Sequence, residues 1–308
     1  MEIALMIEGQ MGLNWPRWKA VAQAVEDLGF AGLYRSDHFT SPAPPDMDSL
    51  ELWTSLTWLA SHTQRIEFGP LVSPFTFRSP SMVARVAAAV DELSGGRLQL
   101  GLGAGWQERE HHNYGFYLGT IEERFQRFEE GLEVVTRLFR SDEPVSYSGN
   151  IYQLNEALLR PNSRNGKGPD IVIGGNGMHR TLPLAAKYAD EWNGVYLDAE
   201  QFADRARFLD ALMDQEGRPR GDLRRTVMLG CVYGRTPKEA DERAKARGAD
   251  DAATLRESSI AAGTAPEIVE FLNGYAQVGC QRVMLQWLEL DELDGLEAMA
   301  KELLPHFN

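Results

Sequence analysis

The chain has 308 residues, and 31 Lys and Arg against 45 Asp and Glu give it a formal net charge of −14. An acidic surface argues against nucleic-acid binding, because neutralising phosphates requires a basic face. With 43% hydrophobic and 25% charged residues, the composition is that of a globular protein and not of a disordered one. No apolar run approaches the roughly 18 residues of a membrane-spanning helix, and the start of the chain lacks a signal-peptide pattern, so we expect a cytoplasmic protein without membrane partners.

Short β-rich apolar runs alternate along the chain with longer segments of helical periodicity. The spacing predicts a helix over Trp15–Leu28, which Gly29 would end, and further helices over Ile121–Phe139 and Thr181–Tyr188. The predicted strands begin near Ile3, Gly32, Ile66, Leu98, Asp170, Trp192, Val227 and Arg282.

Eight such β/α repeats predict a (β/α)8 TIM barrel, with an open doubly wound sheet as the alternative fold. No linker of Pro, Gly and Ser divides the chain, so we expect one domain over residues 1–308. A barrel of this kind needs only about 250 residues. We place the excess in insertions after strand four, at 106–119 and 142–168, and after strand seven, at 248–263.

The loops that follow the predicted strands are where barrel enzymes carry their chemistry. After strand two come Asp37 and His38. An imidazole there can exchange a proton near neutral pH, and a neighbouring carboxylate can raise its pKa or fix its orientation. The alternative is that both side chains only hold the loop together.

A glycine-rich run at 101–105 follows strand four, and Trp106 comes directly after it. The run is not a dinucleotide fingerprint, because Trp106 stands where the last glycine of that motif would be. It could let the backbone approach a flat ligand closely, or it could be a tight turn without a ligand. Trp106 would then form a pocket wall, and Phe75 and Trp287 are further pocket candidates at strand ends.

Residues 106–113 hold two acids and two histidines, but their spacing matches no metal-binding pattern. We therefore expect no metal site there. The segment is predicted to be the solvated start of a helix, on which His111 and His112 point in different directions.

Another glycine-rich run, at 173–180, precedes the predicted helix Thr181–Tyr188. Free N–H groups at a helix N-terminus favour an anion, and Arg180 could add positive charge. A glycine-rich turn without a ligand is the alternative. We also expect a local basic patch for a polyanionic ligand from Arg160, Arg164, Lys167 and Arg180.

Taken together, these segments resemble the bacterial luciferase-like monooxygenase family. The resemblance covers nearly the whole chain and is carried by residues 36–39, 68–78, 101–106, 173–177 and 185–193. Within the family, the pair Asp37 and His38 is most similar to the branch that uses the deazaflavin coenzyme F420. The resemblance implies a TIM barrel that binds the tricyclic ring at its mouth.

The resemblance also implies roles for individual residues. Asp37 would contact the deazaflavin, and His38 would transfer the proton. In this family a non-prolyl cis peptide supports the ring, which corresponds here to the bond between Leu71 and Val72. The remaining ring and phosphate contacts would come from Leu71, Val72, Ala104, Gly105, Gly175, Asn176, Gly177, Met178 and His179.

Two positions depart from the sugar-phosphate dehydrogenases of this branch. Trp106 stands where they place a carboxylate, and Glu108 cannot be assumed to replace it. Arg109 stands where they place an asparagine that contacts the ring. We therefore predict no sugar-phosphate substrate.

Three functions follow as hypotheses. The first is an oxidoreductase that moves a hydride between F420 and a small organic substrate, with His38 as acid or base. The second is a monooxygenase that uses FMN reduced by a partner flavin reductase, together with oxygen. The third is a barrel that binds a flavin-like ligand without turnover. A homodimer is also considered, because the helix at 82–93 could form an interface or could equally face the barrel.

Overall fold

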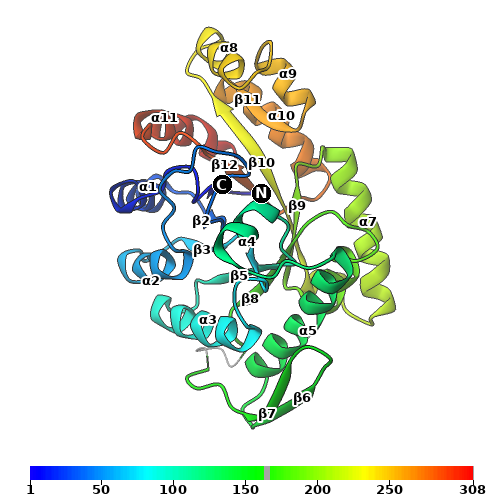
Figure 1. The fold of residues 1–308 in the computed structure, drawn as a ribbon. Helices are drawn as coiled ribbons and strands as arrows, with labels where there is room; N and C mark the ends of the chain where they lie inside the picture. The colour runs from blue at the N-terminus through cyan, green and yellow to red at the C-terminus, as the bar shows by residue number, and fades with distance from the viewer. Residues whose placement is uncertain (163–166, 308) are drawn as a thin grey trace.

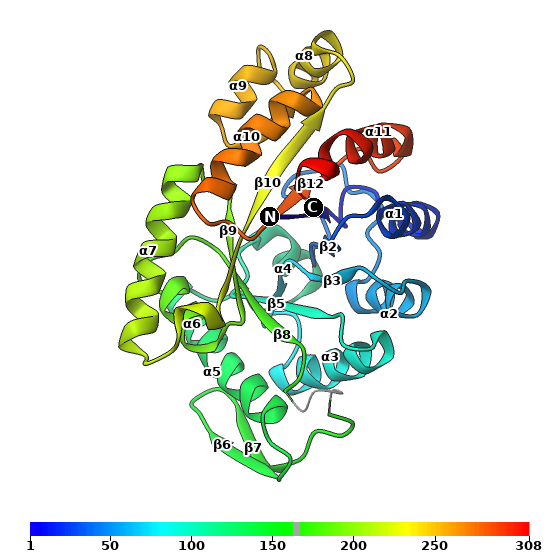
Figure 2. The same cartoon turned by 180° about the vertical axis from the view of Figure 1, so that it is seen from behind.

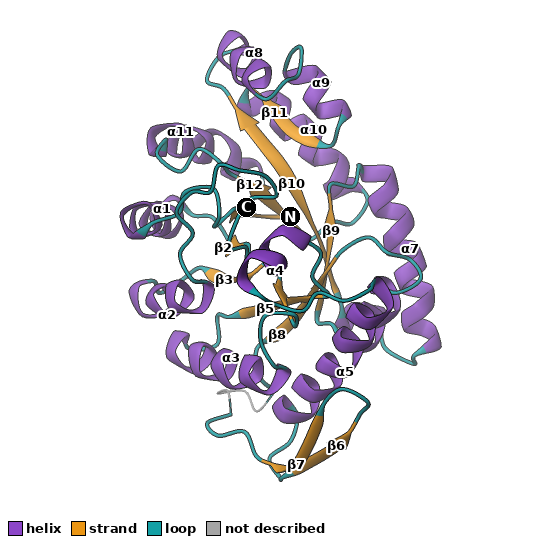
Figure 3. Ribbon diagram, in the orientation of Figure 1, coloured by secondary structure: helices purple, strands orange, loops and turns teal. Residues whose placement is uncertain are grey.

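The computed structural model describes residues 1–162 and 167–307, and parallel strands lie at its centre with helices around them (Figure 3). The central strands are β1 (Glu2–Ile7), β2 (Gly32–Arg35), β3 (Glu67–Pro70), β4 (Ser73–Pro74), β5 (Gln99–Gly103), β8 (Asp170–Gly174), β9 (Glu191–Val195), β10 (Arg224–Tyr233) and β12 (Arg282–Gln286). The helices are α1 (Trp15–Leu28), α2 (Leu52–His62), α3 (Pro80–Ser94), α4 (Glu108–Tyr114), α5 (Ile121–Phe139), α6 (Thr181–Tyr188), α7 (Ala199–Gln215), α8 (Pro237–Ala246), α9 (Ala252–Glu257), α10 (Ala265–Gln277) and α11 (Leu293–Leu303).

The strands form a parallel barrel, as the sequence predicts. Their order is β3-β2-β1-β12-β10-β9-β8-β5-β4. An isolated parallel bridge between Phe68 and Leu98 brings β3 beside β5 and closes the sheet on itself. The (β/α)8 barrel is therefore confirmed, and the alternative of an open doubly wound sheet is wrong.

The third barrel strand is divided into two pieces. Its first half, β3, pairs with β2, and its second half, β4, pairs with β5. Between them lies the Leu71–Val72 peptide bond, which is cis and does not precede proline. The expected cis bond is thus confirmed at the expected position. The backbones approach so closely here that a Cβ on Gly69 would lie 1.8 Å from the backbone oxygen of Gln99, so only glycine fits.

The helices end where local signals place them. The side chain of Asn14 caps the first turn of α1, and Gly29 ends the helix at a φ of 96°. A capping box formed by Thr120 and Glu123 starts α5. Within residues 1–162 and 167–307, no helix is both long enough and apolar enough to cross a membrane.

The insertions carry their own elements. A hairpin of β6 (Val145–Ser148) and β7 (Gln153–Ala157) lies beside α5, where Glu130 accepts three backbone N–H bonds from its turn. The insertion after strand seven holds α9 and β11 (Ile260–Gly263), and β11 extends the sheet by pairing with β10. The hairpin and α8–α9 lie on opposite sides of the barrel (Figures 1 and 2).

Charged residues fill the barrel at the amino ends of its strands. Arg282 is almost fully buried and lies 2.5 Å from Glu2 and 2.6 Å from Glu67. Its guanidinium also donates to the Tyr34 hydroxyl. The opposite end of the barrel, where the strands finish, is the end that stays open.

Candidate active site at the carboxyl ends of the strands

A cavity of about 750 Å³ lies at the carboxyl ends of the barrel strands. Its lining comes from the ends of β1, β2, β5, β8, β9 and β12, from the β3–β4 connection and from α4 and α5. Of the residues that the sequence assigned to the cofactor or the chemistry, those lining the cavity are Asp37, His38, Leu71, Val72, Ala104, Gly105 and Gly175.

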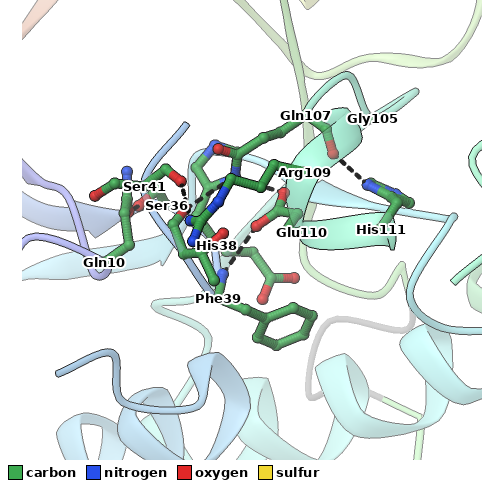
Figure 4. A network of polar contacts seen from close by, with 12 residues as sticks. Gln10, Ser36, His38, Phe39, Ser41, Gly105, Gln107, Arg109, Glu110 and His111 are labelled. Carbon is green, nitrogen blue, oxygen red and sulfur yellow. Dashed lines mark hydrogen bonds and ion pairs between the residues drawn. The ribbon is translucent and has the colours of Figure 1, made fainter. Parts of the chain in front are cut away.

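His38 and Glu110 point toward one another inside this cavity (Figure 4). The imidazole Nδ1 of His38 lies 2.8 Å from Oε1 of Glu110. The other carboxylate oxygen, Oε2, accepts the backbone N–H of Phe39 at 2.9 Å. Since a carboxylate can only accept hydrogen bonds, Nδ1 carries the proton facing Glu110. Nε2 has no partner among the described residues and is the ring nitrogen left for a ligand.

The charge of Glu110 also sets the protonation of His38. Burial by itself lowers the pKa of His38. The hydrogen bond and charge of Glu110, together with the charges of Glu8 and Asp37, outweigh that effect and raise the pKa above its ordinary value. A histidine with this environment can hold and release a proton near neutral pH.

Helix α4 carries Glu110 and crosses the mouth of the barrel in front of the strands (Figure 1). Its position is held by His111, whose Nε2 lies 2.8 Å from the Thr76 hydroxyl and whose ring stacks on Phe77 with 4.7 Å between centroids. Gly115 ends the helix in the left-handed conformation. The carboxylate is therefore fixed by packing and not by a flexible loop.

The prediction of a solvated helix start at 106–113 is wrong for three of its eight residues. Gln107, Glu110 and His111 are buried, whereas His112 is exposed, so the two histidines do point in different directions as expected. Glu110 is the site residue that the sequence reasoning missed. The available signal was the spacing of 107, 110 and 111, which marks one face of a helix. Among the described residues, no group of three or more His, Cys, Asp or Glu side chains could hold a metal.

Asp37 lies next to His38 but has a different environment. Its carboxylate is 2.5 Å from Nη1 of Arg78 and accepts the Ser73 hydroxyl at 2.8 Å. Burial raises the pKa of Asp37, while the charge of Arg78 and both hydrogen bonds lower it, with burial the larger effect. Asp37 thus reaches the cavity as one half of a buried ion pair.

Leu71, Val72, Ala104 and Gly105 line the cavity as an apolar wall, and their predicted contact with the cofactor ring stays a prediction. Glycines make room for this wall. A Cβ on Gly103 would lie 2.6 Å from a methyl group of Val72. A planar ligand could lie against such a surface.

One of the three aromatic residues predicted to line a pocket does so, and the other two do not. Trp106 lines the cavity, and its ring meets that of His38 edge-on at 5.5 Å. Phe75 and Trp287 do not line it, because both are buried in the main hydrophobic core. Phe75 packs on Phe128, and the Trp287 indole N–H donates to a backbone carbonyl.

In the glycine-rich loop before α6, some backbone N–H groups already have an acceptor and others have none among the described residues. The N–H of Gly175 donates to the Asn193 carbonyl at 2.9 Å and is therefore not available to a phosphate. The Asn176 side chain both donates to and accepts from the Val195 backbone, which ties the loop to β9. Backbone N–H groups without an acceptor in the described part of the chain remain at Gly177, Met178 and His179.

The expected basic patch is not found beside the cavity among the described residues. Arg180 forms an ion pair with Glu122, Arg160 forms one with Asp142, and neither they nor Lys167 line the cavity. Arg164 lies outside the described residues. Of the arginines that the structure describes, Arg124 lines the cavity, and it donates to the Gly105 carbonyl at 2.8 Å.

These residues fit a flat ring with an anionic tail. The apolar wall suits a planar aromatic face. The loop before α6 reaches the cavity at Gly175 and carries free N–H donors, and Arg124 lines the same cavity. Asn193 is fully buried at the cavity, and its side-chain oxygen has no hydrogen-bond partner in the described part of the protein. Such an atom needs a donor, which a ligand could supply.

The family model described as "Luciferase-like monooxygenase" matches residues 4–282. The chain belongs to the luciferase-like monooxygenase family. The resemblance read from the sequence motifs is therefore confirmed.

Relatives of the chain are named for more than one type of reaction. An F420-dependent hydroxymycolic acid dehydrogenase of Mycobacterium tuberculosis is 28% identical over 88% of this chain and 71% of its own length. A 5,10-methylenetetrahydromethanopterin reductase of Archaeoglobus fulgidus is 31% identical over 80% of this chain and 66% of its own length. A 4-hydroxyprotoasukamycin monooxygenase of Streptomyces nodosus is 30% identical but matches only 46% of its own length. The chain thus spans from about half to about seven tenths of these relatives.

Solved structures show the same luciferase-like barrel. An F420-dependent secondary alcohol dehydrogenase in complex with an F420-acetone adduct superposes with a TM-score of 0.84 over 100% of this chain and 99% of its own, at 16% identity. The oxygenating component of 3,6-diketocamphane monooxygenase from Pseudomonas putida, in complex with FMN, gives 0.77 over 99% of both chains, also at 16% identity. At these identities the structures establish the fold alone.

Proposed function

We propose that the protein is an F420-dependent oxidoreductase that moves a hydride between the deazaflavin and a small organic substrate. The observation that carries the proposal is the pairing of His38 with Glu110 beside the apolar wall of the cavity. The relatives named as F420-dependent dehydrogenases support the choice of cofactor.

Bound F420 would supply the ring carbon that accepts or gives the hydride. The chain's own residues would orient it and manage the proton. The apolar wall of Leu71, Val72 and Ala104 would support the ring, and the free N–H groups of the loop before α6, with Arg124, would hold its phosphate. His38 would take up or give the accompanying proton at Nε2, with Glu110 fixing the ring and stabilising its protonated form.

Asp37 would act beside this pair as a buried polar contact of the ring. Its charge is matched by Arg78. The ion pair would keep a carboxylate next to an anionic cofactor without placing an unbalanced negative charge there. Both the contact of Asp37 with the ring and the proton-transfer role of His38 stay predictions.

Titration of the purified protein with F420 and with FMN, followed by ligand fluorescence, tests the proposal. We expect F420 to bind more tightly than FMN. Tight FMN binding without F420 binding would instead favour the monooxygenase, whose reduced flavin a partner reductase would supply. Binding of neither ligand would contradict the assignment of the cavity to a flavin-like cofactor. Binding of F420 without hydride transfer to or from any offered substrate would favour a non-catalytic barrel.

A homodimer and a cytoplasmic location stay predictions. On α3, Val83, Ala84 and Ala87 face the core, while Met82 and Leu93 are about half exposed. The outer face of this helix could therefore contribute to an interface. Light scattering on the purified protein measures its mass in solution and decides between monomer and dimer.

A further inference from the structure

A second polar cluster lines the cavity. It consists of Glu8 after β1, Gln10, Tyr196 after β9 and Gln286 at the end of β12. Gln10 donates from Nε2 to one oxygen of Glu8 at 3.0 Å, and Gln286 donates from Nε2 to the other at 2.7 Å. We call these four residues the Glu8 cluster.

The hydrogen bonds around the cluster fix which of its atoms donate and which accept. The Gln286 carbonyl oxygen accepts the Tyr196 hydroxyl at 2.5 Å, and the Gln10 carbonyl oxygen accepts the Ser36 hydroxyl at 2.8 Å, as Figure 4 shows for the second pair. Each amide must therefore turn its NH2 group toward Glu8. The carboxylate lies at the centre of the cluster as an acceptor, with lone pairs left for a ligand.

The cavity has a second acceptor, on strand β9 of the barrel. Asn193 on β9 donates its NH2 group to Thr226 at 2.9 Å, which leaves its carbonyl oxygen without a partner in the described residues. This residue is fully buried and lines the same cavity. A buried oxygen without a donor on Asn193, together with the lone pairs left on the half-buried Glu8 carboxylate, indicates a ligand that brings donors of its own.

The charge of Glu8 is not balanced by a contact. Among the described residues that line the cavity, the basic side chains are His38 and Arg124, and Glu8 forms no ion pair. The buried guanidinium of Arg35 acts on Glu8 at a distance. Its N–H groups, however, are used by the carbonyls of Ser36 and Leu50 and by the Ser55 hydroxyl.

We propose that Glu8 selects the substrate class: an uncharged or cationic molecule with a hydroxyl or amine hydrogen that Glu8 accepts, and not a carboxylate or phosphate. The proposal rests on the proposed function, because it assumes that the cofactor tail occupies the Arg124 side of the cavity. A substrate anion at the Glu8 cluster would meet an unpaired negative charge in a partly desolvated site, where such repulsion is strong. A hydroxyl or amine of the substrate would instead donate a hydrogen bond to the Glu8 carboxylate or to the Asn193 carbonyl oxygen.

The test compares three small probes of similar size on the F420-loaded protein: cyclopentylammonium, cyclopentanol and cyclopentanecarboxylate. Saturation-transfer NMR measures their binding to wild type, to Glu8→Gln and to Glu108→Gln. Glu108 is the matched control, because it is an exposed acid on α4 that does not line the cavity. The affinity of each variant for F420 is measured in a separate titration.

We expect wild type and E108Q to bind the ammonium and the alcohol at least roughly tenfold more tightly than the carboxylate. E8Q should lose most of the preference for the cation over the anion while still binding F420. Equal binding of the three probes to wild type, no binding of any of them, or an unchanged preference in E8Q would overturn the proposal. Failure of F420 to bind any variant would refute the proposed function instead, and the preference would then be measured on the free protein.

Discussion

Replacing Glu110 by Gln removes one charge and hardly changes the size of the side chain. Two donors now share its carboxylate: His38 Nδ1–H at 2.8 Å and the Phe39 N–H at 2.9 Å. An amide has a single oxygen and a donor group in place of the second oxygen. In E110Q one donor therefore loses its acceptor, or His38 moves its proton from Nδ1 to Nε2.

The size of the effect follows from these two bonds. A hydrogen bond to a charged group contributes about 1.5–3 kcal/mol and a neutral one about 0.5–1.5 kcal/mol. The difference of about 1–1.5 kcal/mol corresponds to roughly tenfold in a step that protonates His38. If the tautomer also changes, Nε2 can no longer accept a proton, and the loss extends toward the roughly 10²–10⁴ that a positioned acid–base group contributes.

NMR of protein labelled with ¹⁵N at histidine measures both consequences without a substrate. The chain has six histidines, and the signal of His38 is the one missing from His38→Ala. In E110Q we expect a lower pKa for His38, since the charge and hydrogen bond that raise it are lost, and a larger share of the tautomer protonated at Nε2. An unchanged pKa and an unchanged Nδ1–H tautomer in E110Q would refute the role given to Glu110. Glu108→Gln makes the same change on the exposed side of the helix and should alter neither.

Three further outcomes are expected. His38→Ala should keep F420 affinity within a few fold in a fluorescence titration but lower turnover by roughly 10²–10⁴, and undiminished turnover would exclude His38 from proton transfer. Arg78→Met should lower the free energy of unfolding in urea by about 3 kcal/mol, because Asp37 would stay buried without its partner, and Arg78→Lys should recover part of it. The stability advantage of wild type over E110Q should be full below about pH 6.5, the unfolded value for histidine, and should decline as the pH rises through the raised folded pKa of His38. An advantage that grows with pH would contradict that sign.

The sequence alone determined the features that depend on neighbours along the chain. The ends of α1, α5 and α6 agree with the predicted helices, because periodicity and caps are local signals. The barrel followed from eight β/α repeats, since parallel strands joined by helices can close in few ways. The cis bond between Leu71 and Val72 followed from the resemblance to the family and not from a local pattern.

Only the tertiary structure decided which polar groups meet. Glu110 reaches His38 across 72 positions of the chain, and Gln286 reaches Glu8 across 278. Hydrophobic periodicity does not predict such pairs. The buried residues of α4 are polar, so its sequence pattern is the same as that of a helix face exposed to solvent. The partners are set when barrel closure brings the carboxyl ends of distant strands to one rim and packing selects the side-chain directions. Position along the chain therefore places the loops, and closure of the sheet determines which of their side chains act together.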